Sequence, residues 1–258
     1  MKRRLAVVSA LTLLLCQVTR ADAATPDLPA LIARSKPSLV LVGTYSETDN
    51  PRFQFRGTGF VVGDGHLAAT NAHVLPDAPN AASDLQRQLV VQVRDAEGQW
   101  IRRAATVETL DRAHDLVLLR FDGPAVQTLP LDRGALAAEG TPIVLMGFPL
   151  GGALGFSVVT HQGIVSSVVP IALPAPGADG LNARAVRQLR EGGFQILQLD
   201  AVCYPGNSGG PVIDTDSGRV VGIVNMVLVK GSRESALSSP TGISYAIPIQ
   251  HVQALLAR

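Results

Sequence analysis

The sequence predicts an all-β protein made of two six-stranded antiparallel β-barrels, with a short helix near the N-terminus and another at the C-terminus. About twelve short runs rich in Val, Ile, Leu and Thr are separated by Gly, Asp, Asn and Pro. This spacing is typical of barrels and sandwiches rather than of alternating strands and helices. Residues 123–139 contain few strand formers and divide the runs into two sets of about six. We therefore expect one barrel at about residues 36–125, a second at about 136–248, and a cleft between them.

The first 23 residues are predicted to be an export signal that is removed. Basic residues from Lys2 precede an apolar run from Leu5 to about Val18, and Ala21-Asp22-Ala23 has the small residues of a cleavage site. The run is shorter than the about 20 apolar residues that a membrane span needs. Cys16 leaves a lipid anchor as the alternative, although it lacks the preceding small residue of a lipoprotein signal. We expect a periplasmic or secreted mature chain, residues 24–258, without stable membrane insertion.

The predicted elements follow in chain order. Asp27 can cap a helix over Leu28–Arg34, which ends near Pro37. The predicted strands are Ser38–Thr44, Gly57–Val62, His66–Thr70, Leu89–Val93, Ala104–Thr109, Leu116–Phe121, Pro142–Gly147, Gly163–Val168, Phe194–Leu199, Pro211–Ile213, Val220–Val227 and Ser244–Ile247. Two later helices are expected, at Ala183–Arg190 and at Pro248–Ala257.

Composition argues against several classes of function. The predicted signal holds four of the 22 basic residues and one of the 21 acidic ones, which leaves 18 basic and 20 acidic residues, a formal charge of −2. Without a basic surplus, nothing favours binding to nucleic acid. Cys203 is the single cysteine after the signal, so an internal disulfide and a zinc-ribbon site are both excluded. We expect neither a metal nor a cofactor.

The most specific stretch is Pro205-Gly206-Asn207-Ser208-Gly209-Gly210-Pro211. Glycines on both sides of Ser208 permit a tight turn with positive φ, which exposes the hydroxyl as a nucleophile. They also allow the N–H groups of Gly206 and Ser208 to point into one pocket, as an oxyanion hole requires. The alternative is a glycine-rich hairpin with a solvated serine.

A serine nucleophile needs a base, and the base needs an orienting carboxylate. His73 follows an apolar strand that becomes small and polar, where a side chain can face a cleft. Asp115 stands at the start of a strongly apolar strand, and its burial would be costly without a partner such as His73. The alternatives are a structural histidine and a turn aspartate.

Four motifs resemble the conserved blocks of trypsin-like serine proteases, and more narrowly those of the bacterial HtrA/Deg (high-temperature-requirement) branch. They are Gly57-Thr58-Gly59-Phe60, Thr70-Asn71-Ala72-His73-Val74, His114-Asp115-Leu116-Val117-Leu118-Leu119 and Gly206-Asn207-Ser208-Gly209-Gly210-Pro211. The resemblance runs from about Leu28 to Val252. It implies a chymotrypsin-like double barrel, with Ser208 as nucleophile, His73 as general base and acid, and Asp115 as orienting carboxylate. The Gly206 and Ser208 amides would form the oxyanion hole.

The sequence thus predicts an exported serine endopeptidase that cleaves proteins or peptides through an acyl-enzyme, in protein quality control or degradation. A proteolytically silent binding module of the same fold and an esterase-like hydrolase are the alternatives. Two features differ from HtrA proteins: no PDZ domain is expected after the protease, and Ala172–Gln195 is longer than the family pattern. The oligomeric state stays open.

The substrate pocket is predicted to be shallow and apolar. Val202 occupies the position, six residues before Ser208, where enzymes that prefer Lys or Arg carry a carboxylate. Val224-Asn225-Met226 is expected to form the opposite wall, so cleavage should follow Val, Ala or Ile. Asp200 is interpreted as a structural acid, with a role as specificity acid as the alternative.

The remaining histidines and Cys203 are given structural roles. His114 is expected on the strand face opposite Asp115, and His66 and His161 are expected in loops. Cys203 is expected to be a small buried side chain rather than a second nucleophile, because no base is evident beside it.

Overall fold

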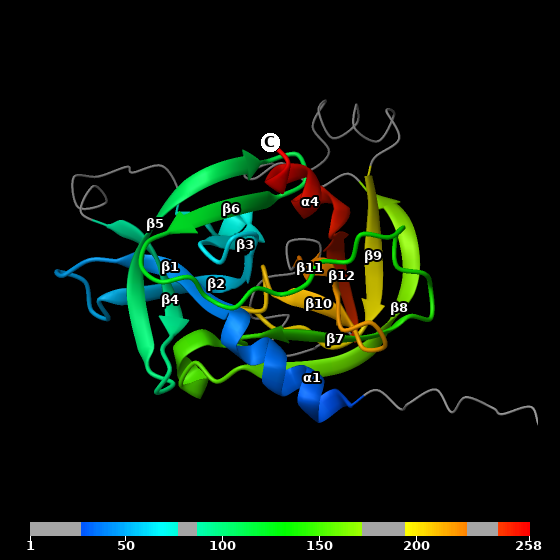
Figure 1. The fold of residues 1–258 in the computed structure, drawn as a ribbon, viewed down its shortest axis with the longest axis horizontal. Helices are drawn as coiled ribbons and strands as arrows, with labels where there is room; N and C mark the ends of the chain where they lie inside the picture. Colours follow the sequence, from blue (N-terminus) through cyan, green and yellow to red (C-terminus); the bar gives the residue numbers. More distant parts are fainter. Residues whose placement is uncertain (1–26, 77–86, 172–193, 226–241) are drawn as a thin grey trace, which may run out of the picture.

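A computed structural model describes residues 27–76, 87–171, 194–225 and 242–258, which form two closed six-stranded antiparallel barrels (Figure 1). The all-β, two-barrel prediction is confirmed, and each of the twelve predicted strands overlaps an observed one. The first barrel contains β1 Leu39–Tyr45, β2 Phe53–Val62, β3 Leu67–Asn71, β4 Gln88–Arg94, β5 Trp100–Asp111 and β6 Leu116–Phe121. The second contains β7 Pro142–Gly147, β8 Val159–Ile171, β9 Phe194–Asp200, β10 Pro211–Asp214, β11 Val220–Val224 and β12 Ile243–Pro248.

The two barrels share one connectivity. Around the first barrel the order is β1-β2-β3-β6-β5-β4, and around the second it is β7-β8-β9-β12-β11-β10. Adding six to each strand number of the first order gives the second. No internal repeat is visible in the sequence, so the repetition lies in the topology.

The strands nearest the junction between the barrels are buried on both faces. In β1, Val40 and Val42 pack with other side chains of the first barrel, while Leu39 and Leu41 belong to a cluster that includes Val144 and Ile213 of the second. Residues of β6 alternate between the same two clusters. A strand buried on both faces requires an unbroken apolar run, which explains these sequences.

Two helices flank the barrels in Figure 1, α1 in blue and α4 in red. In α1, Leu28–Ser35, the Asp27 carboxylate accepts a hydrogen bond from the Ala30 N–H at 3.1 Å, as the predicted cap requires. In α4, Gln250–Leu256, Val252 and Leu255 are buried in the cluster between the barrels. The predicted helix at Ala183–Arg190 lies outside the described residues. Within the described ranges, no helix has the length and apolar character to cross a membrane.

Candidate active site

The strand register brings His73 and Asp115 together. Asn71, the last residue of β3, pairs with Leu116, the first residue of β6. The residues that follow β3 and precede β6 therefore meet at one edge of the first barrel. The Asp115 Oδ1 accepts the His73 backbone N–H at 2.8 Å, and its Oδ2 lies 2.6 Å from His73 Nδ1. The structure thus brings together the histidine and the carboxylate that the sequence predicts as partners, and the two contacts fix both the position and the plane of the imidazole ring.

Hydrogen bonds hold the backbone of Asp115 in place. Its carbonyl oxygen accepts hydrogen bonds from the Ala72 N–H at 3.0 Å and from the Asn71 side-chain amide at 3.2 Å. Its φ of 53° lies in the left-handed region, which Asp tolerates better than most residues. The carboxylate is thus presented to His73 from a turn whose own backbone is hydrogen-bonded to the end of β3 and the residue after it.

Asn225 is a partner of this carboxylate that the sequence analysis does not assign. Asn225 follows β11 and is completely buried, and its Nδ2 donates to Asp115 Oδ2 at 2.8 Å. The sequence predicts Asn225 in the substrate pocket, but its side chain lies on Asp115. The feature of the sequence that could have indicated this role is a polar residue directly after a strand of buried apolar residues. The contact joins the second barrel to the His–Asp pair of the first.

Ser208 lies in the turn that leads into β10, close to the same corner. Its carbonyl oxygen accepts the Thr58 N–H at 2.9 Å, and its side chain is nearly buried. A Cβ on Gly57 would lie 3.0 Å from the Ser208 carbonyl oxygen and 2.7 Å from Cγ2 of Val74, the neighbour of His73. Gly57 therefore lies between the two predicted catalytic segments. The hydrogen bond between Ser208 and His73 that a triad requires stays a prediction.

The glycines of the turn have the conformation that the sequence predicts. Gly206 has a φ of 104° and Gly209 one of 83°, values that L side chains rarely adopt. A Cβ on Gly206 would collide with the Phe148 carbonyl oxygen. Any other residue at position 206 would force this turn to change shape.

The predicted pocket residues lie in different environments. Val202 is half-buried, whereas Val224 is completely buried among side chains of the second barrel. Met226 lies outside the described residues. Asp200 is exposed at the end of β9. The specificity of this pocket stays a prediction.

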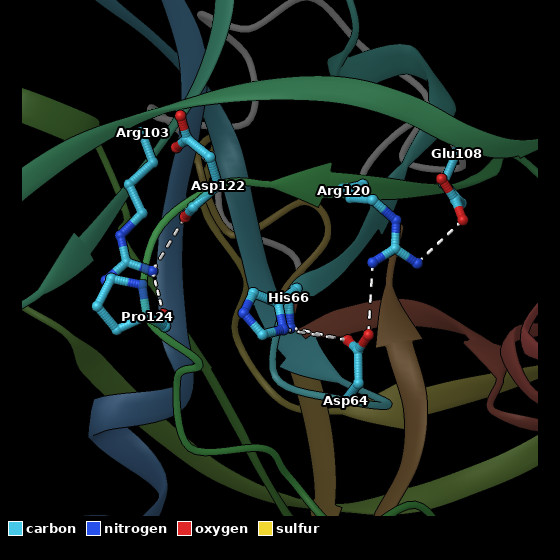
Figure 2. A network of polar contacts seen from close by, with 7 residues as sticks. All are labelled: Asp64, His66, Arg103, Glu108, Arg120, Asp122 and Pro124. Carbon is cyan, nitrogen blue, oxygen red and sulfur yellow. Dashed lines mark hydrogen bonds and ion pairs between the residues drawn. The ribbon is translucent and has the colours of Figure 1, made fainter.

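A second His–Asp pair lies on the outside of the first barrel (Figure 2). His66 Nδ1 is 3.7 Å from Asp64 Oδ1, and Arg120 bridges Asp64 and Glu108. The backbone N–H of His66, together with Arg120, holds the pKa of Asp64 below its usual value. The His66 side chain is half-buried and the other three are more exposed, and surface ion pairs contribute little to stability. His66 lies in a turn as expected, whereas His161, also expected in a loop, lies within β8.

A third pair involves His114 and a buried carboxylate. His114 Nδ1 lies 3.0 Å from Asp111 Oδ2, and the His114 ring stacks on His251 of α4 with centroids 4.0 Å apart. Phe194 packs edge-on against both rings, and Arg258 lies 3.4 Å from Asp111. Burial opposes ionisation of Asp111, but its hydrogen bonds from His114 keep its pKa below the usual value. This cluster fastens α4 to the first barrel.

The cluster predicts a loss of stability in mild acid. Burial, and then the charge of His114, lower the pKa of His251 to about 4. An unfolded histidine binds a proton near pH 6.5, so the unfolded state gains protons first as the pH falls from 6.5 to 4. We expect the wild-type free energy of unfolding to fall by about 1 kcal/mol more than that of His251→Phe between pH 7 and pH 5, since partial exposure screens the effect. Urea denaturation at both pH values measures this difference.

His66→Phe is the matched control for that experiment, because it removes an imidazole from the pair with Asp64, outside this cluster. It should leave the acid dependence of the wild type unchanged. Equal losses in the wild type and in His251→Phe would contradict the prediction.

Cys203 is confirmed as a buried side chain. Burial raises the pKa of its thiol to about 12, so at neutral pH the nucleophilic thiolate is scarce. Among residues 27–76, 87–171, 194–225 and 242–258, no group of three or more His, Cys, Asp or Glu side chains could hold a metal ion.

Comparison with known proteins agrees with this geometry. The family model of the trypsin-like peptidase domain matches residues 57–223. The mitochondrial serine protease HTRA2 of Drosophila virilis is 32% identical over 204 residues, which cover 78% of this chain and 39% of that protein. The corresponding proteins of Drosophila grimshawi and Drosophila ananassae are 32% and 31% identical to this chain over 204 residues. Each of these alignments covers 78% of this chain and 38% of the relative. This chain thus spans well under half the length of these relatives. It belongs to the trypsin-like peptidase family and, within it, is similar to the HtrA serine proteases.

Proposed function

We propose that this protein is an exported serine endopeptidase that hydrolyses peptide bonds in proteins, in quality control or degradation. One observation carries the proposal. The Asp115 carboxylate holds both the backbone and the ring of His73, beside a glycine-rich turn that contains Ser208. Family membership supports it. The exported location rests on the basic, apolar and small-residue pattern of the first 23 residues.

The geometry supports a two-step acyl transfer. As the Ser208 Oγ bonds to the scissile carbonyl carbon, its proton passes to His73 Nε2, and Asp115 stabilises the imidazolium through Nδ1. The Gly206 and Ser208 N–H groups bind the negative oxygen of the tetrahedral intermediate. Collapse of that intermediate breaks the C–N bond, and His73 gives its proton to the departing amine. A water molecule, deprotonated by His73, then attacks the acyl carbon. The ester C–O bond breaks, His73 returns the proton to Ser208 Oγ, and the acid is released.

The test of this function is digestion of casein by the purified protein, combined with labelling by a fluorophosphonate. A protease is labelled and produces peptides. An esterase is labelled but leaves casein intact, and a silent binding module does neither. Either of the last two outcomes contradicts the proposed function. Mass spectrometry of the peptides also reports the cleavage sites.

The cleavage sites test the pocket prediction. With Val202 in place of a carboxylate, a substrate Lys or Arg would be buried without a charge partner, which is costly. We therefore expect most cuts after Val, Ala or Ile. Val202→Asp should move the cuts toward Lys and Arg. If the wild type already cuts mostly after Lys and Arg, the pocket prediction is wrong and Asp200 becomes the candidate specificity acid.

A further inference from the structure

Four consecutive carbonyl groups of the nucleophile turn, residues 205–208, are each held by a hydrogen bond. The Pro205 carbonyl accepts the Leu150 N–H at 2.8 Å, and the Asn207 carbonyl accepts the Gly210 N–H at 2.9 Å. The other two carbonyls are both held by Thr58. Its Oγ1 donates to the Gly206 carbonyl at 2.7 Å, and its N–H donates to the Ser208 carbonyl at 2.9 Å.

These bonds determine where the N–H groups of the turn point. In a trans peptide unit the N–H and the C=O point in opposite directions. The Pro205 and Asn207 carbonyls point at their hydrogen-bond donors. The N–H groups of the same two peptide units, those of Gly206 and Ser208, therefore point away from these donors. These are the two N–H groups that the proposed mechanism uses to bind the oxyanion. Glycine has little conformational preference of its own, so Gly206 depends on such external contacts to keep a φ of 104°.

The Thr58 hydroxyl differs from the other three anchors. Leu150, Gly210 and the Thr58 backbone each supply an N–H, which almost any residue would provide. The bond to the Gly206 carbonyl is the one that depends on a side chain. That hydroxyl also accepts the Phe148 N–H at 3.1 Å, and Thr58 is completely buried. It therefore joins β2 of the first barrel, the end of β7 in the second, and the turn that contains Ser208.

We propose that Thr58 is a positioning residue for the oxyanion hole. Its hydroxyl holds the carbonyl of the peptide unit after Gly206, as the Leu150 N–H holds that of the unit before it. The two bonds together fix the backbone conformation at which the Gly206 N–H is directed at the developing oxyanion. Without this hydroxyl, the Gly206 carbonyl and the Phe148 N–H lose a buried partner. Gly206 then samples other conformations, in which its N–H no longer serves the transition state. The inference rests on the proposed proteolytic function and assigns a role to a residue that does not touch the substrate.

The test compares Thr58→Val, which has nearly the same shape without the hydroxyl, with Thr58→Ser, which keeps it. Rates are expressed per active site titrated with fluorophosphonate, so that a misfolded fraction does not count. Removing a whole oxyanion donor costs about 10²- to 10³-fold in kcat. We expect at least about a tenfold lower kcat for Thr58→Val, with KM within about twofold. Thr58→Ser should stay within about threefold of the wild type.

A transition-state analogue gives a second readout. A peptide aldehyde forms a tetrahedral adduct with the serine, so Thr58→Val should weaken its inhibition by the same factor as kcat/KM. Binding of the corresponding product peptide should not change. Thr215→Val is the matched control, since that buried hydroxyl donates to the Pro142 carbonyl at 3.3 Å, at the opposite end of β7. If circular dichroism shows that Thr58→Val does not fold, Thr58→Ala takes its place.

Each outcome decides a different point. If Thr58→Val and Thr58→Ser lose activity equally, packing rather than the hydroxyl matters, and the inference is wrong. If Thr58→Val keeps its kcat while Ser208→Ala is inactive, the inference fails but the proposed protease stands. If Ser208→Ala is as active as the wild type, the proposed function fails, and the role of Thr58 fails with it.

Discussion

Replacing Ser208 by Ala is expected to lower kcat for peptide cleavage by about 10⁴- to 10⁶-fold, because the hydroxyl forms the acyl bond. The fold should survive, since the backbone contact from Thr58 to the Ser208 carbonyl does not involve the side chain. Alanine also retains the Cβ and differs only by the missing oxygen. The measurements are kcat on a fluorogenic peptide and the midpoint of thermal unfolding, which should move by no more than a few degrees.

Ser166→Ala is the matched control for this experiment. Ser166 is a half-buried serine of β8 whose hydroxyl donates to the Gln198 carbonyl at 3.1 Å, within the second barrel. It should keep full activity and full labelling by fluorophosphonate. More than a few per cent of residual activity in Ser208→Ala, after contaminating proteases are excluded, would show that another residue is the nucleophile.

The number of strands and their positions along the chain could be predicted because most lie in buried apolar runs between turn residues. β6 is an example, since its predicted bounds, Leu116–Phe121, are the observed ones. The ends of other strands were not predictable in this way. β5 extends over Trp100–Asp111 rather than residues 104–109, and many of its side chains are exposed. Backbone pairing with β4 and β6, and not apolar side chains, continues that strand, and a composition-based analysis cannot detect such pairing.

Local sequence could predict the contact between His73 and Asp115, but it could not predict the contacts that cross from one barrel to the other. His73 and Asp115 follow from chemistry, because a buried carboxylate at a strand start needs a partner. Asn225 and Thr58 act through contacts between the two barrels, and their roles depend on how the barrels pack. No local pattern reveals which polar residue meets which partner across that junction. The structure was needed to assign both.

The Asp115 contacts predict a loss of about 10⁴-fold in kcat for Asp115→Asn. Asp115 accepts at both oxygens, from the His73 N–H at Oδ1 and from the His73 ring and Asn225 at Oδ2. An amide can accept at only one of these positions. If its oxygen faces the backbone N–H of His73, its NH₂ faces the ring and forces Nδ1 to accept a hydrogen bond. The proton of the neutral ring then resides on Nε2, and His73 cannot take the proton of Ser208.

The opposite orientation of the introduced amide does not restore the site. It would place the NH₂ group against the His73 backbone N–H, so two donors would face each other within a half-buried turn. Asp111→Asn is the matched control, because Asp111 holds the ring and the backbone N–H of His114 in the same manner, four residues earlier. Stopped-flow acylation should show the loss of about 10⁴-fold in Asp115→Asn and a near wild-type rate in Asp111→Asn. Equal losses in both variants would mean that the turn, and not the tautomer of His73, limits the reaction. A near wild-type rate in Asp115→Asn would remove Asp115 from the mechanism, because no other acceptor for the His73 Nδ1–H is present among the contacts that the structure describes.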